Sequence, residues 1–111
     1  MPSERIIRPH MGKPWPTMPD VIVGLMHFLH GVPDVVVDPQ NDHFVFVHLP
    51  GKRSVTFGER CVEDMPRVFE VYVSADHIYV MTRAPDDYTA ALADGFAQRC
   101  ADFFGNGRFD R

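Results

Sequence analysis

Hydrophobic side chains recur at a helical period after Thr17, and this periodicity predicts a helix over residues 18–30. Thr17 and Asp20 stand three residues apart, which matches a capping box at the helix start. Gly31 follows the last periodic position and is typical of a helix that ends in the left-handed conformation. The stripe predicted to face the core consists of Ile22, Leu25 and Leu29.

Beyond Gly31 the pattern changes to short β-branched and aromatic runs that are separated by turn residues, which predicts strands. We expect strands over residues 34–38, 43–49, 52–57, 67–73 and 77–83. The run HFVFVHL at 43–49 is apolar almost throughout, which indicates a central strand covered on both faces. Pro50-Gly51 fits a type II turn. The polar segment 58–66 is expected to form one helical turn.

A second helix is predicted from the proline and acidic residues at 84–87 to the glycines at 105 and 107. Its apolar stripe is expected to contain Tyr88, Leu92, Phe96, Cys100 and Phe103. These elements predict a single α+β domain, with about five antiparallel strands in a meander and the N-terminal and C-terminal helices on one face. The predicted order is α-β-β-β-β-β-α, with an extended arm at 1–17, the domain at 18–107 and a tail at 108–111.

This order of elements is similar to that of type III secretion chaperones, which are small, acidic, dimeric proteins. The similarity lies in the element order alone, since no residue motif carries it. The segment between the third and fourth predicted strands is also short for that family. The resemblance is a fold-level analogy, and a shared fold says little about function.

Prolines at positions 2, 9, 14 and 16 predict an extended arm, because proline fixes φ and lacks an amide donor. Trp15 stands between two of these prolines. A single tryptophan on a stiff arm is expected to anchor it in an apolar groove. That groove belongs either to the same domain, which we favour, or to a partner.

Composition and charge narrow the classes of function. The chain has 111 residues, of which 45% are hydrophobic, and this suits one globular core. Its net charge of −4 disfavours general binding to nucleic-acid phosphates. No apolar run approaches the ~20 residues that cross a membrane, and the N-terminus shows no secretory signal. We therefore expect a cytoplasmic protein of bacterial or phage origin, with neither nucleic acid nor membrane as its partner.

Six histidines and two cysteines are the side chains best suited to chemistry. His27 and His30 lie three residues apart on the polar side of the first helix and are the candidate metal ligands, but a metal site needs further ligands. We expect no metal, no cofactor and no catalytic residue. Cys100 is expected in the core, whereas Cys61 follows Arg60 and could be a slightly activated thiol.

The first helix is apolar over more than its core stripe, because Val23, Met26 and Phe28 widen the apolar arc. A helix with so wide an apolar arc is normally covered on two sides. The sheet supplies one cover, and the arm, a second copy or another protein supplies the other. We therefore predict a partner-binding surface made of Trp15, Val23, Met26 and Phe28.

The favoured function is a small non-enzymatic module that binds another protein, as an inhibitor, an immunity protein or a chaperone-like adaptor. We expect it to be a homodimer that pairs through the first helix or an edge strand. One alternative is a small-molecule or metal-dependent enzyme in which His27, His30 and a further ligand converge. The other is a component of phage or virion assembly.

Overall fold

The computed structural model describes residues 2–83 and 85–111 of the chain. In chain order the elements are β1 (Pro2–Ile7), α1 (Met18–Phe28), β2 (Val36–Asn41), β3 (Phe44–Phe57), β4 (Arg60–Val73), β5 (Ile78–Arg83) and α2 (Asp87–Phe104). Met1 in the predicted arm and Ala84 at the predicted start of the second helix lie outside the described residues.

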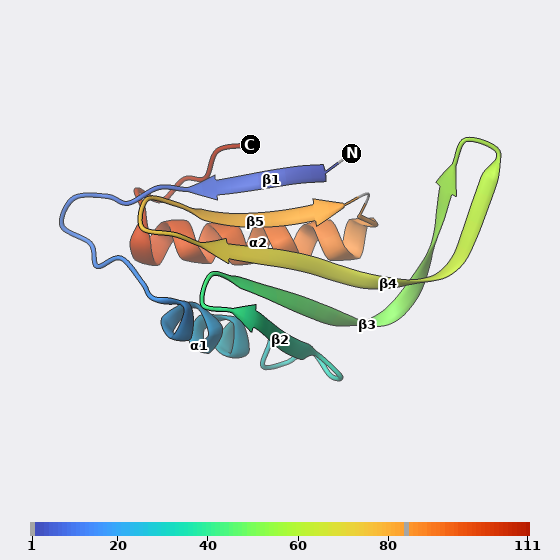
Figure 1. Cartoon of the computed structure of the whole chain (residues 1–111), viewed down its shortest axis with the longest axis horizontal. Helices are drawn as coiled ribbons and strands as arrows, with labels where there is room; N and C mark the ends of the chain where they lie inside the picture. The colour runs from blue at the N-terminus through green and yellow to red at the C-terminus, as the bar shows by residue number, and fades with distance from the viewer. Residues whose placement is uncertain (1, 84) are drawn as a thin grey trace.

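The strands form one sheet in the order β1-β5-β4-β3-β2, and every neighbouring pair is antiparallel. Figure 1 shows α2 along β5 and β4, while α1 lies beside β2, toward the β2 edge of the sheet. The predicted α+β class, with a five-stranded antiparallel sheet and two helices, is confirmed. The segments that supply two of the five strands differ from those expected from the sequence.

The first difference is a long hairpin where two separate strands and a helical turn were expected. Residues 43–49 and 52–57 belong to the single strand β3, and the register shifts between Leu49 and Lys52. Proline has no amide to donate and Gly51 has a φ of 79°, so Pro50-Gly51 forms an irregularity within the strand instead of a turn that reverses it. Segment 58–66 holds the hairpin turn and the first half of β4. The hairpin extends beyond the rest of the molecule (Figure 1).

The second difference is at the N-terminus, where part of the predicted arm is strand β1. It pairs with β5 from Pro2↔Arg83 to Ile7↔Ile78. Arg5 and Ile7 point into the core. Because one of these two inward positions is an arginine, the sequence does not show the alternation of hydrophobic and polar residues that marks a strand. The predicted tail also returns to the sheet, since Asp110 forms a bridge with Ile6. The chain therefore begins with a strand, whereas the element order that resembles type III secretion chaperones begins with a helix.

The helix starts were predicted well, and the end of α1 was not. Thr17 and Asp20 form the expected capping box. The helix ends at Phe28 with Leu29 as its cap, and Gly31 does not have the positive φ that was expected of it. In α2, the buried positions are mostly small residues that let the helix approach the sheet closely. They are Thr89, Ala93, Phe96, Ala97, Cys100 and Ala101, whereas Tyr88 and Phe103 of the predicted stripe are exposed.

Both helices pack on the same face of the sheet, which we call the covered face. Alternate side chains of each strand point toward them, and Phe28 of α1 meets Phe96 of α2 with ring centroids 5.7 Å apart. The fully buried strand residues of this core include Val45, Val47, Phe69, Val71, Ile78 and Val80. Neither helix is long and apolar enough to cross a membrane, as far as the described residues go.

Candidate binding surfaces

The α1 surface carries two of the four predicted partner-binding residues. Val23 is 54% exposed and Met26 is 62% exposed, while Val21 and Leu25 of the same helix are buried. The apolar arc of α1 is therefore wider than the part that the domain covers, as the sequence predicted. Val23 and Met26 are available to a partner.

Trp15 and Phe28, the other two predicted residues, hold the domain itself together. The Trp15 side chain packs against the core, and its indole Nε1 donates a hydrogen bond of 2.7 Å to the Ser74 carbonyl oxygen. This position agrees with the expectation that the tryptophan anchors the arm to its own domain. Phe28 lies over Gly95 of α2, where an added Cβ would be 2.8 Å from the phenylalanine ring. Glycine at position 95 therefore lets the two helices approach.

An apolar groove of about 300 Å³ runs between α1 and β2. It is lined by Ile22 and Met26 of the helix and by Leu29 at its C-cap, and from the following loop and strand by Val32, Val35 and Val37. All six side chains are aliphatic or methionine, so this groove can bind apolar side chains but offers no acid, base or nucleophile. Strand β2 beside it is an edge of the sheet, because among the described residues β3 is the one strand that pairs with it.

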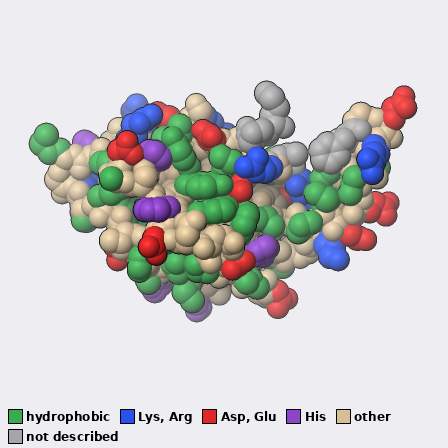
Figure 2. Space-filling model, in the orientation of Figure 1, with side chains coloured by type: hydrophobic (Ala, Val, Ile, Leu, Met, Phe, Trp, Pro, Cys, Tyr) green, Lys and Arg blue, Asp and Glu red, His purple; other side chains and the backbone are tan. Residues whose placement is uncertain are grey.

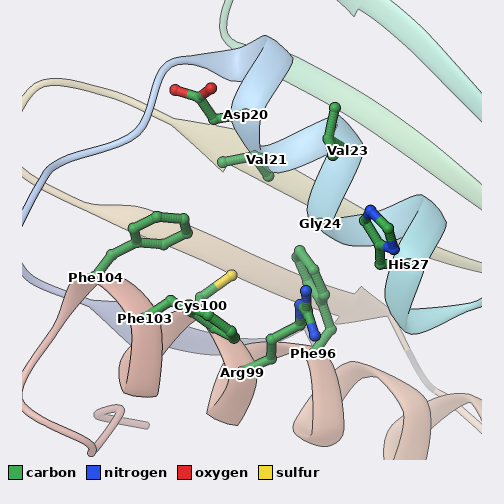
Figure 3. A pocket seen from close by; sticks show the side chains of 10 residues that line it. All are labelled: Asp20, Val21, Val23, Gly24, His27, Phe96, Arg99, Cys100, Phe103 and Phe104. Carbon is green, nitrogen blue, oxygen red and sulfur yellow. The ribbon is translucent and has the colours of Figure 1, made fainter.

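A second, smaller hollow of about 150 Å³ lies between the two helices. Figure 3 shows Asp20 and His27 on the α1 side, and Phe96, Arg99 and Cys100 on the α2 side. The Arg99 guanidinium lies over the Phe103 ring, 4.7 Å from its centroid. Burial raises the pKa of the Cys100 thiol to about 12, so the thiol stays protonated and is no nucleophile.

The structure places the predicted histidine pair at an exposed rim. His27 and His30 border a shallow hollow with Val23 and Met26. Within residues 2–83 and 85–111, no group of three or more His, Cys, Asp or Glu side chains could hold a metal ion. Three other histidines each lie near one polar group: His43 Nδ1 is 3.2 Å from the Val73 carbonyl oxygen, His48 is 3.9 Å from Asp38, and His77 is 2.7 Å from Asp76. Cys61 is exposed on the hairpin.

The face of the sheet opposite the helices is a surface that the sequence did not reveal, and we call it the open face. The strand registers align Ile6, Tyr79, Tyr72 and Phe44 in one row across four strands. A second row contains Met81, Glu70 and Phe46. Phe44 stacks on Tyr72 with centroids 4.4 Å apart and an interplanar angle of 4°. Figure 2 shows hydrophobic side chains gathered over the strands on this face.

The open face corrects the interpretation of the run at 43–49. Val45, Val47 and Leu49 are buried beneath the helices, whereas Phe44, Phe46 and His48 are only partly buried on the other side. The strand is apolar on both faces, yet the described part of the chain covers only one of them with helices. The exposed second face could have been inferred from the predicted helices: if both lie on one face of the sheet, no helix shields the other face.

Comparison with family models, with curated proteins and with solved structures finds no match for this chain. The function of the chain must therefore be inferred from these surfaces.

Proposed function

We propose that this chain is a protein-binding module that takes an extended, apolar segment of another protein into the groove between α1 and β2. The observation that carries this proposal is the groove itself, which is lined by apolar side chains and lies beside the edge strand β2. An edge strand offers backbone donors and acceptors to an added strand, and a groove next to it takes alternate side chains of that strand. An inhibitor, an immunity protein and a chaperone-like adaptor can all act in this way, and we place the module in the cytoplasm.

The size of β2 sets the length of the bound segment. The strand has six residues, and at ~3.3 Å per residue it can pair with roughly 20 Å of extended chain. About three side chains of such a segment would point into the groove, because alternate residues face the same side of a strand. Pro39 in β2 lacks an amide donor, which shortens the part of this edge that can pair.

The charge around the groove determines which residues are favoured on either side of the bound apolar segment. Asp34, Asp38 and Asp42 are exposed in and around β2. The whole chain has a net charge of −4. The favoured ligand is therefore a segment with alternating apolar residues that is flanked by Lys or Arg, since opposite charges steer and orient association.

The test is selection from a displayed library of random peptides on the immobilised protein, followed by affinity measurement and amide hydrogen exchange. Selected peptides are expected to alternate apolar residues between basic ones and to slow exchange in β2. Met26→Glu places a charge in the groove and should weaken binding by at least about tenfold. Met11→Glu is the matched control, because Met11 is 94% exposed and does not line the groove. Binding that is insensitive to Met26→Glu, or protection at β1 instead of β2, would contradict the proposal.

A further inference from the structure

We propose that the open face is the interface of a homodimer, in which two copies of this chain pack sheet against sheet with their helices outside. This surface is separate from the groove between α1 and β2, so a dimer could still bind a partner protein there. It also differs from the first helix and the edge strand, which the sequence suggested for pairing. Four observations lead to a second copy as the occupant.

The first observation is the aromatic and aliphatic character of the face. Phe44 lies against both Tyr72 and Phe46, with ring centroids 4.4 Å and 4.6 Å apart. On β5, Tyr79 and Met81 continue the same surface, and neither is fully buried. Aromatic residues and methionine are enriched in protein interfaces, and partly exposed rings gain most when a partner removes the remaining water.

The second observation is the balance of charge on this face. Glu70 is only 7% exposed, and it accepts hydrogen bonds from Arg83 Nε at 3.1 Å and from the Tyr72 hydroxyl at 3.4 Å. A basic partner would find this carboxylate already paired. The exposed acids of the face, Glu4 and Asp38, lie on the edge strands β1 and β2. The centre of the face therefore carries no uncompensated charge, which favours a second copy of the same acidic chain there.

The third observation is the area. At ~4.8 Å between strands and ~3.3 Å per residue, five strands of six residues present roughly 480 Å² on one face, and the hairpin adds roughly 250 Å². The sum approaches the ~800 Å² that each partner contributes to a standard interface. The sheet alone falls below the roughly 600 Å² per partner at the lower end of standard interfaces, whereas the sheet with the hairpin lies within that range.

The fourth observation is the hairpin, beside whose outer half no strand lies within residues 2–83 and 85–111. The pairing of β2 with β3 stops at His48, and the pairing of β5 with β4 stops at Glu70. A ribbon of two strands is only marginally stable in water without a packed face. At its base, a hollow of about 190 Å³ on the open face is lined by Phe46, Met65, Pro66 and Val68 and by three charged residues, Arg53, Glu70 and Arg83. In a two-fold dimer each hairpin would pack on the other copy, and each hollow would receive one of its side chains.

Such a dimer is a sandwich of two sheets about 10 Å apart with an aromatic interior. Every contact in it occurs twice, because the two-fold axis makes the same surface meet itself. Phe46 lies in the second row of the face, next to Glu70 of the central strand, and Phe46→Glu would place an unpaired carboxylate inside the interface.

Sedimentation equilibrium from about 1 to about 100 μM tests the proposal. The wild-type chain, with a protomer mass of 12.6 kDa, should have twice that mass. Phe46→Glu should raise the dissociation constant by at least about 30-fold, the effect of a single hot spot. Met26→Glu, on the α1 surface, should leave it unchanged. A monomer at all concentrations, or a dimer that is lost with Met26→Glu and kept with Phe46→Glu, overturns the proposal.

A second measurement covers the case in which Phe46→Glu fails to fold. The photoreactive analogue p-benzoylphenylalanine replaces Tyr79, which it resembles in shape, and in a control chain it replaces Met11. Illumination should give a covalent band of two chains from position 79 and none from position 11. No two-chain band from position 79, or an equal band from both positions, overturns the proposal.

Discussion

The two faces of the sheet are built from the same strands, and they differ in what lies against them. On β4, Phe69 and Val71 point to the helices and are fully buried, while Tyr72 and Val68 point the other way and keep part of their surface exposed. Both sets are hydrophobic. The apolar pattern of a strand therefore shows which of its faces need to be shielded from water. In this chain the two helices shield one of these faces, and the other is left partly exposed.

The faces also differ in how they hold charge. On the covered face, the guanidinium of Arg5 is 2% exposed; it pairs with Asp94 of α2 and donates to Thr82 Oγ1 at 3.1 Å. On the open face, Glu70 is the buried member and its cation, Arg83, is largely exposed. The covered-face pair ties a helix to the sheet, and the open-face pair ties only two neighbouring strands.

The largest expected effect separates the two faces within one strand. Phe69→Ala should lower the free energy of unfolding by about 3–5 kcal/mol, because it leaves a cavity in a packed core. Tyr72→Ala should cost under about 2 kcal/mol, since its ring is already partly exposed to water. Urea unfolding at a low protein concentration measures both values. Equal losses would mean that the open face is as tightly packed as the covered one.

A smaller effect is expected from the buried charge pair. Asp94→Ala leaves the buried Arg5 guanidinium without its carboxylate and also removes the ion-pair partner of the exposed Arg111. Because Asp94 is itself 36% exposed, we expect a loss of about 2–3 kcal/mol. Adding Arg5→Met to this variant should restore part of the stability, because the uncompensated charge is gone. The exposed pair Arg8–Asp110 is the control, and Asp110→Ala should cost less than about 1 kcal/mol. A double variant that is no more stable than Asp94→Ala would contradict this account.

The smallest of the three effects depends on pH. Partial burial would raise the pKa of Asp86, but hydrogen bonds from Thr89 and the nearby Arg67 guanidinium lower it to about 2. Because this pKa is below its usual value of 3.8, the carboxylate stabilises the fold above about pH 4, and this contribution is lost as the pH falls toward 2.

Asp86→Ala should therefore lower the free energy of unfolding by about 2 kcal/mol at pH 7, through the lost cap of α2 and the lost pair with β4. The difference from wild type should shrink between about pH 4 and pH 2. Unfolding curves of both proteins over this range measure it. A difference that stays constant with pH would show that the charge of Asp86 is not what stabilises the helix start.

Local signals in the sequence were sufficient for the helices and for most of the sheet. The capping box at Thr17 and the proline with acids before α2 act within a few residues, so they could be recognised from the sequence. The long hairpin was hidden because Pro50-Gly51 resembles a reversing turn, and only the pairing of β3 with β4 on both sides of it shows that the strand continues. The exposure of Val23 and Met26 was predicted from helical phase, whereas the internal positions of Trp15 and Phe28 depended on Ser74 and Gly95, far away in the chain.

The sequence by itself determined the α+β class, the two helices and the excess of apolar surface, because these follow from periodicity and composition over short windows. Only the tertiary structure decided that β1 joins the sheet beside β5, that Arg5 is buried against Asp94, and that Val45 rather than Phe44 faces the helices. The physical reason is that burial depends on which distant segments meet. Period two assigns Phe44 and Val45 to opposite faces, but the helices alone determine which of the two is covered.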